Sequence, residues 1–359
     1  MNRMKKPLFF FLAIFASLLS FAQGTISGTV VDAETKQPLD GASVFAQNTT
    51  KGTTTDKEGT FKLHLEKGGY EINVTFTGYA SRTINLEVAG DRTFNLEMQR
   101  ADNTMGEVII KNTAEVPDGW AKYGEFFLKH FIGATPNADS CALLNPQALK
   151  FLYFKRNDRL KVLATEPLQI QNKSLGYNLR YELDSFVYFF KTDLNSYRGK
   201  CLFLPMEGDS LQQLAWQKRR KETYGGSRLH FLRAYYDSTL EKEGFAVDLY
   251  KPSKYNQFAP VKNPYDTAYY FFNDTAASAE VFFPVKASIT YTKKAPEKRY
   301  LQQQSLPLDV PIQISYVDLA DAILIKANGY FTDQRSWVNQ GYWSWKNLAD
   351  QLPYDYEPE

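Results

Sequence analysis

Hydrophobic and polar residues alternate through residues 24–99, and glycines separate the alternating runs. In one run Phe61, Leu63 and Leu65 alternate with polar neighbours, and Tyr70 begins the same pattern in the next run. A period of two residues is typical of half-buried strands, and glycine suits the turns between them. Six or seven such runs fit in this stretch. The pattern therefore predicts a small β-sandwich.

A longer region follows a polar linker and mixes helical with strand periods. Trp120, Phe127 and Phe131 recur at helical spacing between Asp118, a candidate N-cap, and Gly133. We expect strands over residues 149–154, 160–165, 177–192, 281–292, 312–316 and 322–326. Most connections between these strands are hairpin-like, so the region is predicted to be an antiparallel α+β domain.

Two helices are predicted in the middle of this region. Ser210 and Gln213 have the spacing of a capping box, which would start the first helix. Ser227 is the predicted N-cap of the second helix, and Gly244 is predicted to end it. A further short helix is expected near Trp345. The fold class is therefore mainly β, a β-sandwich followed by an antiparallel α+β domain.

The start of the chain predicts export. Three cations among the first six residues precede an apolar run of about 14 residues, and Ala22 and Gln23 flank a cleavage pattern. The alternative, an uncleaved membrane anchor, would need an apolar run of roughly 20 residues. The predicted organisation is a signal peptide at 1–22, the sandwich at 23–99, a strand and linker at 100–118, and the α+β domain at 119–359.

The chain has two cysteines, Cys141 and Cys201. An oxidising compartment outside the cytoplasm permits a disulfide between them. The alternative is two separate buried thiols, because a free cysteine behaves as a small apolar residue. Both interpretations stay open at the level of sequence.

Spaced glycine and aspartate residues in the first region resemble a known family. The stretch from Gly28 to Asp32, residues 38–44, 52–61 and the run ending at Tyr79 are similar to the carboxypeptidase-like regulatory domain. The resemblance implies a transthyretin-like sandwich. It also implies an envelope protein of Bacteroidota type, because the module occurs at the N-terminus of TonB-dependent receptors. Residues 107–110 resemble the strand that follows the module there.

The resemblance does not imply peptidase activity, because the module is an appendage of carboxypeptidases and not their catalytic domain. A zinc carboxypeptidase needs a His-x-x-Glu pair and a distant histidine as metal ligands. His64, His130 and His230 are the three histidines, and none has glutamate three positions later. We therefore predict a protein that is not an enzyme, with no catalytic residues, no metal site and no cofactor.

One cluster of side chains nevertheless has the residue types of a ligand-binding site. Ser227, His230 and Arg233 are spaced by three residues at the start of a predicted helix, so their side chains would be neighbours. A helix N-terminus favours anions, which makes the cluster a candidate ligand site. The structural alternative is an N-cap serine, a packed histidine and an arginine paired with Asp237.

Net charge and hydropathy limit the kinds of partner that the protein can be expected to bind. Lys and Arg number 42 against 40 Asp and Glu, so the basic excess of a typical nucleic-acid binder is missing. No apolar run after the signal peptide reaches the length of a transmembrane helix. The second region also resembles the C-terminal part of some exported Bacteroidota proteins that are named only for their regulatory domain. The matching stretches are residues 133–138, 141–146, 224–227, 230–233, 341–343 and 352–356. This resemblance implies no activity.

The sequence thus predicts a non-enzymatic scaffold or adaptor that is exported to the periplasm or the outer membrane. Its partner would be an envelope protein or a polysaccharide. One alternative is a carbohydrate-binding protein that uses exposed aromatic side chains at Tyr269, Tyr270, Trp343 and Trp345. The other is an unrecognised hydrolase around Ser227 and His230.

Overall fold

The computed structural model describes residues 24–101, 114–251, 257–332 and 336–358. The predicted signal peptide, its cleavage site between Ala22 and Gln23, and the strand predicted at 107–110 lie outside the described residues. Within the described part, strands outnumber helices, and the chain forms the predicted mainly β fold.

The first seven strands form the predicted β-sandwich. They are β1 (Gly24–Asp32), β2 (Ser43–Ala46), β3 (Gly52–Thr54), β4 (Thr60–Leu65), β5 (Gly68–Thr75), β6 (Arg82–Val88) and β7 (Arg92–Met98). One sheet has the order β4-β1-β7 and the other β3-β2-β5-β6. The alternating side chains Ile26, Phe61, Leu63, Ile72 and Leu96 meet between the sheets, because a period of two directs every second residue inward.

A six-stranded antiparallel sheet follows, with one helix on it. Its strands are β8 (Cys141–Leu143), β9 (Leu149–Phe154), β10 (Arg159–Ala164), β11 (Leu168–Asn172), β12 (Tyr177–Phe189) and β13 (Leu194–Pro205). Helix α2 (Gly119–Phe131) packs on this sheet through Phe127, whose ring lies 5.2 Å from that of Phe186, and through Phe131. The predicted third member of that stripe, Trp120, is 38% exposed and lies outside the core.

The last part of the chain has a five-stranded and a three-stranded sheet. The larger sheet contains β14 (Phe245–Lys251), β15 (Gln257–Pro260), β18 (Ala287–Tyr291), β19 (Gln313–Leu319) and β21 (Trp337–Gly341). The smaller contains β16 (Tyr270–Asn273), β17 (Ser278–Val281) and β20 (Ile323–Ile325). The helices are α3 (Ser210–Tyr224), α4 (Arg228–Tyr236), α5 (Leu240–Glu243), α6 (Lys298–Gln303) and α7 (Tyr342–Trp345).

Three predicted elements differ from the observed ones. The capping box of α3 uses Asp209 and Gln212, one position before the predicted pair. The helix predicted to run to Gly244 is interrupted after α4, where Ser238 adopts a left-handed φ of 57°. The strand predicted at 281–292 is divided between β17 and β18, which belong to different sheets.

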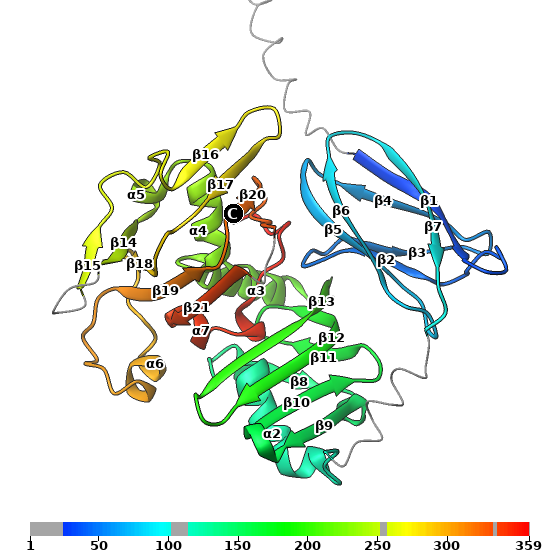
Figure 1. Ribbon diagram of the computed structural model, residues 1–359, viewed down its shortest axis with the longest axis horizontal. Helices are drawn as coiled ribbons and strands as arrows, with labels where there is room; N and C mark the ends of the chain where they lie inside the picture. The colour runs from blue at the N-terminus through cyan, green and yellow to red at the C-terminus, as the bar shows by residue number, and fades with distance from the viewer. Residues whose placement is uncertain (1–23, 102–113, 252–256, 333–335, 359) are drawn as a thin grey trace, which may run out of the picture.

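The sandwich lies against the rest of the molecule, and the C-terminus lies near the middle of the molecule (Figure 1). The turn after β2 meets the edge of β13: Asn48 N donates to Cys201 O at 2.7 Å, and Phe203 N donates to Thr49 O at 2.9 Å. Lys326 also pairs with Glu87 of β6, with 2.9 Å between Nζ and Oε2. Backbone and side-chain hydrogen bonds thus fix the sandwich on the α+β region.

Candidate functional site

Ser227 is the N-cap of α4, and His230 and Arg233 lie on that helix. Ser227 caps the helix, and its Oγ accepts a hydrogen bond from the backbone N of His230 at 3.1 Å. The imidazole Nδ1 of His230 accepts from Gly226 N at 3.2 Å, which places the ring proton on Nε2. Nε2 lies 3.3 Å from Oε2 of Glu243. The serine hydroxyl therefore faces the helix backbone, and neither ring nitrogen faces that hydroxyl.

The ring of His230 is packed among aromatic side chains. Its centroid lies 4.7 Å from that of Tyr224 and 4.9 Å from that of Phe245, and the residue is buried. Burial lowers the pKa of His230, although its hydrogen bond to Glu243 opposes the shift. A neutral, packed imidazole of this kind contributes to folding, and the cluster opens into neither pocket described for the molecule.

Arg233 binds the chain itself. Its Nη1 donates to Tyr356 O at 2.8 Å, its Nη2 donates to Tyr354 O at 3.0 Å, and its Nε donates to Asn328 O at 3.3 Å. Its ion pair is with Glu357, at 3.3 Å from Nη2 to Oε1, and not with the predicted partner Asp237. The guanidinium that could have bound an external anion is thus occupied by the C-terminal segment.

Cys141 and Cys201 are both free thiols in the structure, which contradicts a disulfide between them. Cys141 lies on β8 and Cys201 on β13, and the sheet places β11 and β12 between those strands. Three strand spacings amount to about 14 Å, far beyond the Cα separation that a disulfide spans. Burial raises the pKa of Cys141 to about 12, which favours the protonated thiol over the reactive thiolate.

The four aromatic residues considered for sugar binding do not form one exposed row. Trp343 is in the core, and its Nε1 donates to Gly226 O at 2.8 Å. Tyr270 stacks on a buried tyrosine, and Trp345 donates to Gln303 Oε1 at 2.7 Å. Tyr269 is half-buried and lines a pocket. Among these four residues, Tyr269 has the placement of a ligand contact.

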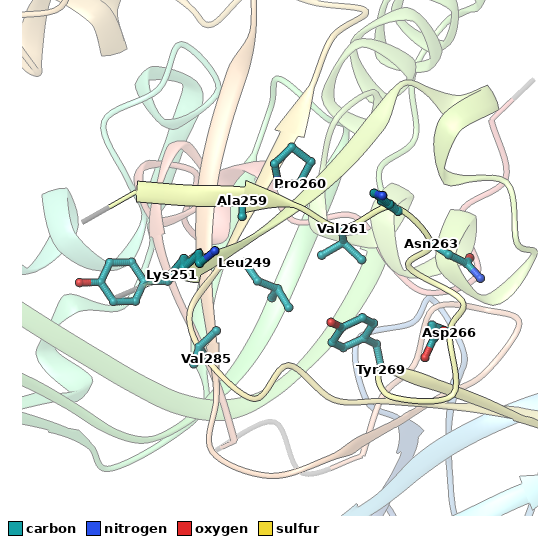
Figure 2. A pocket seen from close by; sticks show the side chains of 11 residues that line it. Leu249, Lys251, Ala259, Pro260, Val261, Asn263, Asp266, Tyr269 and Val285 are labelled. Carbon is teal, nitrogen blue, oxygen red and sulfur yellow. The ribbon is translucent and has the colours of Figure 1, made fainter. Parts of the chain in front are cut away.

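That pocket is an open depression of about 630 Å³ beside β14 and β15 (Figure 2). Leu249, Val261 and the ring of Tyr269 surround its middle, while Asn263 and Asp266 lie on one side and Lys251 on the other. An apolar floor with a few polar groups at its margins is the usual composition of a ligand site.

The loop that forms one wall of the pocket is held in place from behind. Tyr235 Oη donates to Pro264 O at 2.7 Å, and Leu240 N donates to Tyr265 Oη at 3.0 Å. Asp266 O accepts from Tyr269 N at 2.8 Å, which fixes the backbone of the aromatic contact. The wall is therefore formed before any ligand binds, which reduces the entropy lost on binding.

The sequence pointed to Tyr269 but not to Leu249, Val261 or Asn263. Residues 263–266 contain an Asn-Pro dipeptide and an aspartate, which predict a turn. Nothing in that pattern tells which strands the turn will face, because the pocket is assembled from two strands and a loop. Among the described residues, no group of His, Cys, Asp and Glu is arranged to hold a metal ion. In that same part of the chain, no helix has the length and apolarity needed to cross a bilayer.

Comparison with known proteins identifies the first region. The family model of the CarboxypepD_reg-like domain matches residues 26–110. The TonB-dependent receptor SusC of Bacteroides thetaiotaomicron is 36% identical over 117 residues, which cover 32% of this chain and 11% of that protein. The TonB-dependent receptor P3 of Formosa agariphila is 22% identical over 109 residues, which cover 30% of this chain and 11% of that receptor.

Bacillopeptidase F of Bacillus subtilis is also similar, with 30% identity over 115 residues, which cover 29% of this chain and 8% of that protein. The chain therefore spans about a tenth of the length of each of these curated relatives. The matching family has a non-catalytic fold. Over residues 26–110 this chain is thus similar to the CarboxypepD_reg-like domain, and two of the curated proteins that resemble it are TonB-dependent receptors.

Proposed function

We propose that the protein is a non-enzymatic adaptor or scaffold of the bacterial cell envelope that binds a partner through its α+β region. One observation carries the proposal. The Ser227–His230–Arg233 cluster is occupied by the fold itself, whereas the pocket beside β14 and β15 is open and its loop wall is fixed. The predicted signal peptide and the envelope relatives support the location.

The test is cross-linking in intact cells, followed by purification of the exported protein and identification of what is bound. We expect one envelope component in near-stoichiometric amount, and loss of that component in Tyr269→Ala. Phe271→Ala is the matched control, because Phe271 is 59% exposed and does not line the pocket. Recovery of the protein alone, together with hydrolytic activity that requires His230, would refute the adaptor role.

A polysaccharide is the second candidate partner, and the make-up of the pocket favours it. The apolar face of a sugar ring could lie on Tyr269, while the Asp266 carboxylate accepts hydrogen bonds from the sugar hydroxyls and the Asn263 amide accepts or donates them. Lys251 and Lys262 add positive charge beside the ring, which favours an acidic sugar. In gels that contain polygalacturonate, we expect the wild-type protein and Phe271→Ala to be retarded and Tyr269→Ala to migrate freely. Equal migration of all three would exclude this ligand class at the pocket.

A further inference from the structure

The last residues of the chain lie between the sandwich and α4 (Figure 1). Leu352 and Tyr354 are buried, and both belong to the core of the six-stranded sheet. The residues that follow extend away from that core and make polar contacts on two sides. We call residues 352–357 the C-terminal clasp. The clasp contacts the six-stranded sheet, the sandwich and α4.

On the sandwich side, the clasp binds the turn between β2 and β3. Tyr354 N donates to Asn48 O at 2.7 Å, and Asp355 Oδ1 accepts from Thr50 N at 2.9 Å. The other carboxylate oxygen of Asp355 accepts from the hydroxyl of Thr50, and Lys51 Nζ lies 4.0 Å from it. Hydrogen bonds to a carboxylate are stronger than those between neutral groups, so Asp355 stabilises this contact more than a neutral side chain would.

On the helix side, the clasp binds Arg233, which is 7% exposed. The guanidinium donates to the carbonyl groups of both Tyr354 and Tyr356. The ring of Tyr356 also lies 5.7 Å from that of Tyr224. Arg233 on α4 therefore binds the clasp at Tyr354 and Tyr356. The clasp in turn binds the sandwich through Tyr354 and Asp355.

Polar bonds and some apolar packing join the sandwich to the rest. Phe45 of β2 is fully buried but lies outside the sandwich core, and a Cβ on Gly52 would lie 3.0 Å from Leu202 Cδ2. The sandwich core and the two large cores of the α+β region have no residue in common. Among the described residues, the bonds across the boundary include those of the clasp, the pairing of Asn48 and Thr49 with β13, and side-chain contacts such as Lys326 with Glu87 and Asn328 with Gly69 O. An interface of this kind permits relative motion of domains unless specific bonds prevent it.

We propose that the C-terminal clasp is a releasable lock, with Arg233 as its positioning residue, and that it holds the sandwich in one orientation over the edge of β13. While the clasp is closed, the turn at Asn48 and Thr49 covers Cys201 O and Phe203 N. When it opens, the sandwich moves away and this strand edge becomes accessible. Unpaired strand edges bind other strands, so the clasp controls a pairing surface. This inference is independent of whether the pocket binds a partner.

The test measures the distance between the two parts directly. Spin labels are placed at Lys62→Cys on β4 and Lys218→Cys on α3, both exposed positions, in a Cys141→Ser background. We expect one narrow distance distribution in the closed protein. Asp355→Ala removes the bonds to Thr50, and Arg233→Gln removes those to the clasp carbonyls, so each should add a second, broad population. Glu357→Ala is the matched control, because Glu357 is largely exposed and its loss leaves the carbonyl contacts intact.

The lock is refuted if folded Asp355→Ala protein keeps the single narrow distribution of the wild type. Arg233 is buried, so if Arg233→Gln does not fold, Asp355→Ala at the edge of the interface decides the question. An equal broadening in Glu357→Ala would also overturn the proposal, since it would show that any change in this segment loosens the sandwich.

Discussion

Gly28 on β1 shows how a single residue sets the approach of two strands. A Cβ at this position would lie 1.7 Å from the backbone O of Phe94 on β7. The neighbouring atom belongs to the backbone, so it cannot rotate away. Gly28→Ala should therefore destabilise the sandwich by about 2 kcal/mol, as overpacking does, measured by urea denaturation.

Gly90→Ala is the control for that substitution. A Cβ at Gly90 would meet no atom within 4 Å, and its φ is not in the left-handed region. We expect unchanged stability within the error of the measurement. A loss equal to that of Gly28→Ala would mean that general chain stiffening, and not the close approach to Phe94, limits this sheet.

The residues that carried the family resemblance have structural roles. Asp32 is buried, and its Oδ1 accepts from the backbone N of Glu34 and of Thr35, both at 2.8 Å. Its Oδ2 accepts from Tyr79 Oη at 2.6 Å, so two residues of the resemblance meet although 47 positions separate them. These bonds, with that of Tyr79 the strongest, hold the pKa of Asp32 well below its usual range. Two residues that carry the resemblance thus belong to one hydrogen-bond network within the sandwich.

His230 makes stability depend on pH. Burial lowers its folded-state pKa below the unfolded value of about 6.5. Its contribution is therefore complete above the unfolded pKa and is lost as the pH falls from that value toward the folded pKa. In His230→Asn, whose side chain can still accept from Gly226 N, the fall in unfolding free energy below pH 6.5 should be smaller. Parallel pH profiles of variant and wild type in urea titrations would contradict this assignment.

At the scale of elements, the sandwich was predictable and the later sheets were less so. Alternation is local, and strands such as β4 bury one face only, so the sequence pattern shows them, whereas β2 and β5 are buried on both faces. In residues 281–292 the same apolar run supplies both β17 and β18, because the chain leaves one sheet and enters another. A period of two residues identifies strands but does not tell which sheet they join.

Trp216 is one of the side chains that hold helix α3, together with Arg220, which donates to Leu175 O at 2.7 Å. Trp216 is 8% exposed, and its Nε1 donates to Lys173 O at 2.9 Å. Its ring fits against Gly176, where a Cβ would lie 2.3 Å away. Trp216→Ala should cost about 3 kcal/mol, as for other buried aromatic residues, and hydrogen exchange should accelerate across α3.

Trp120→Ala on α2 provides the comparison, because that ring is 38% exposed. It should cost less than about 1 kcal/mol, since surface substitutions have small effects. Exchange across α3 that does not change in Trp216→Ala would show that the helix is held by other contacts.

At the scale of the whole molecule, the candidate site was only partly predictable. The spacing of Ser227, His230 and Arg233 placed them correctly on one helix, yet the residues that occupy Arg233 come from the other end of the chain. The pocket likewise joins Leu249 of β14 to Tyr269 through a loop. Contacts between distant segments depend on tertiary packing, which no local pattern records.

The parallel pairing of β1 with β7 has a mechanical consequence. The register runs from Ile26 opposite Arg92 to Asp32 opposite Met98, so the chain enters the sandwich at one end of this pair and leaves at the other. Tension applied along the chain therefore shears all the hydrogen bonds between these strands together. Pulling from Lys67 and Ala89 instead opens the antiparallel β5–β6 pair one bond at a time.

Single-molecule force measurements should give a clearly higher unfolding force when the sandwich is pulled from the start of β1 and the end of β7 than when it is pulled from Lys67 and Ala89. Equal forces would mean that the β1–β7 pair does not limit unfolding under load, which is governed by the unfolding rate. The expected result would show that the sandwich resists tension applied between its two ends, because β1 must shear from β7 before the domain yields.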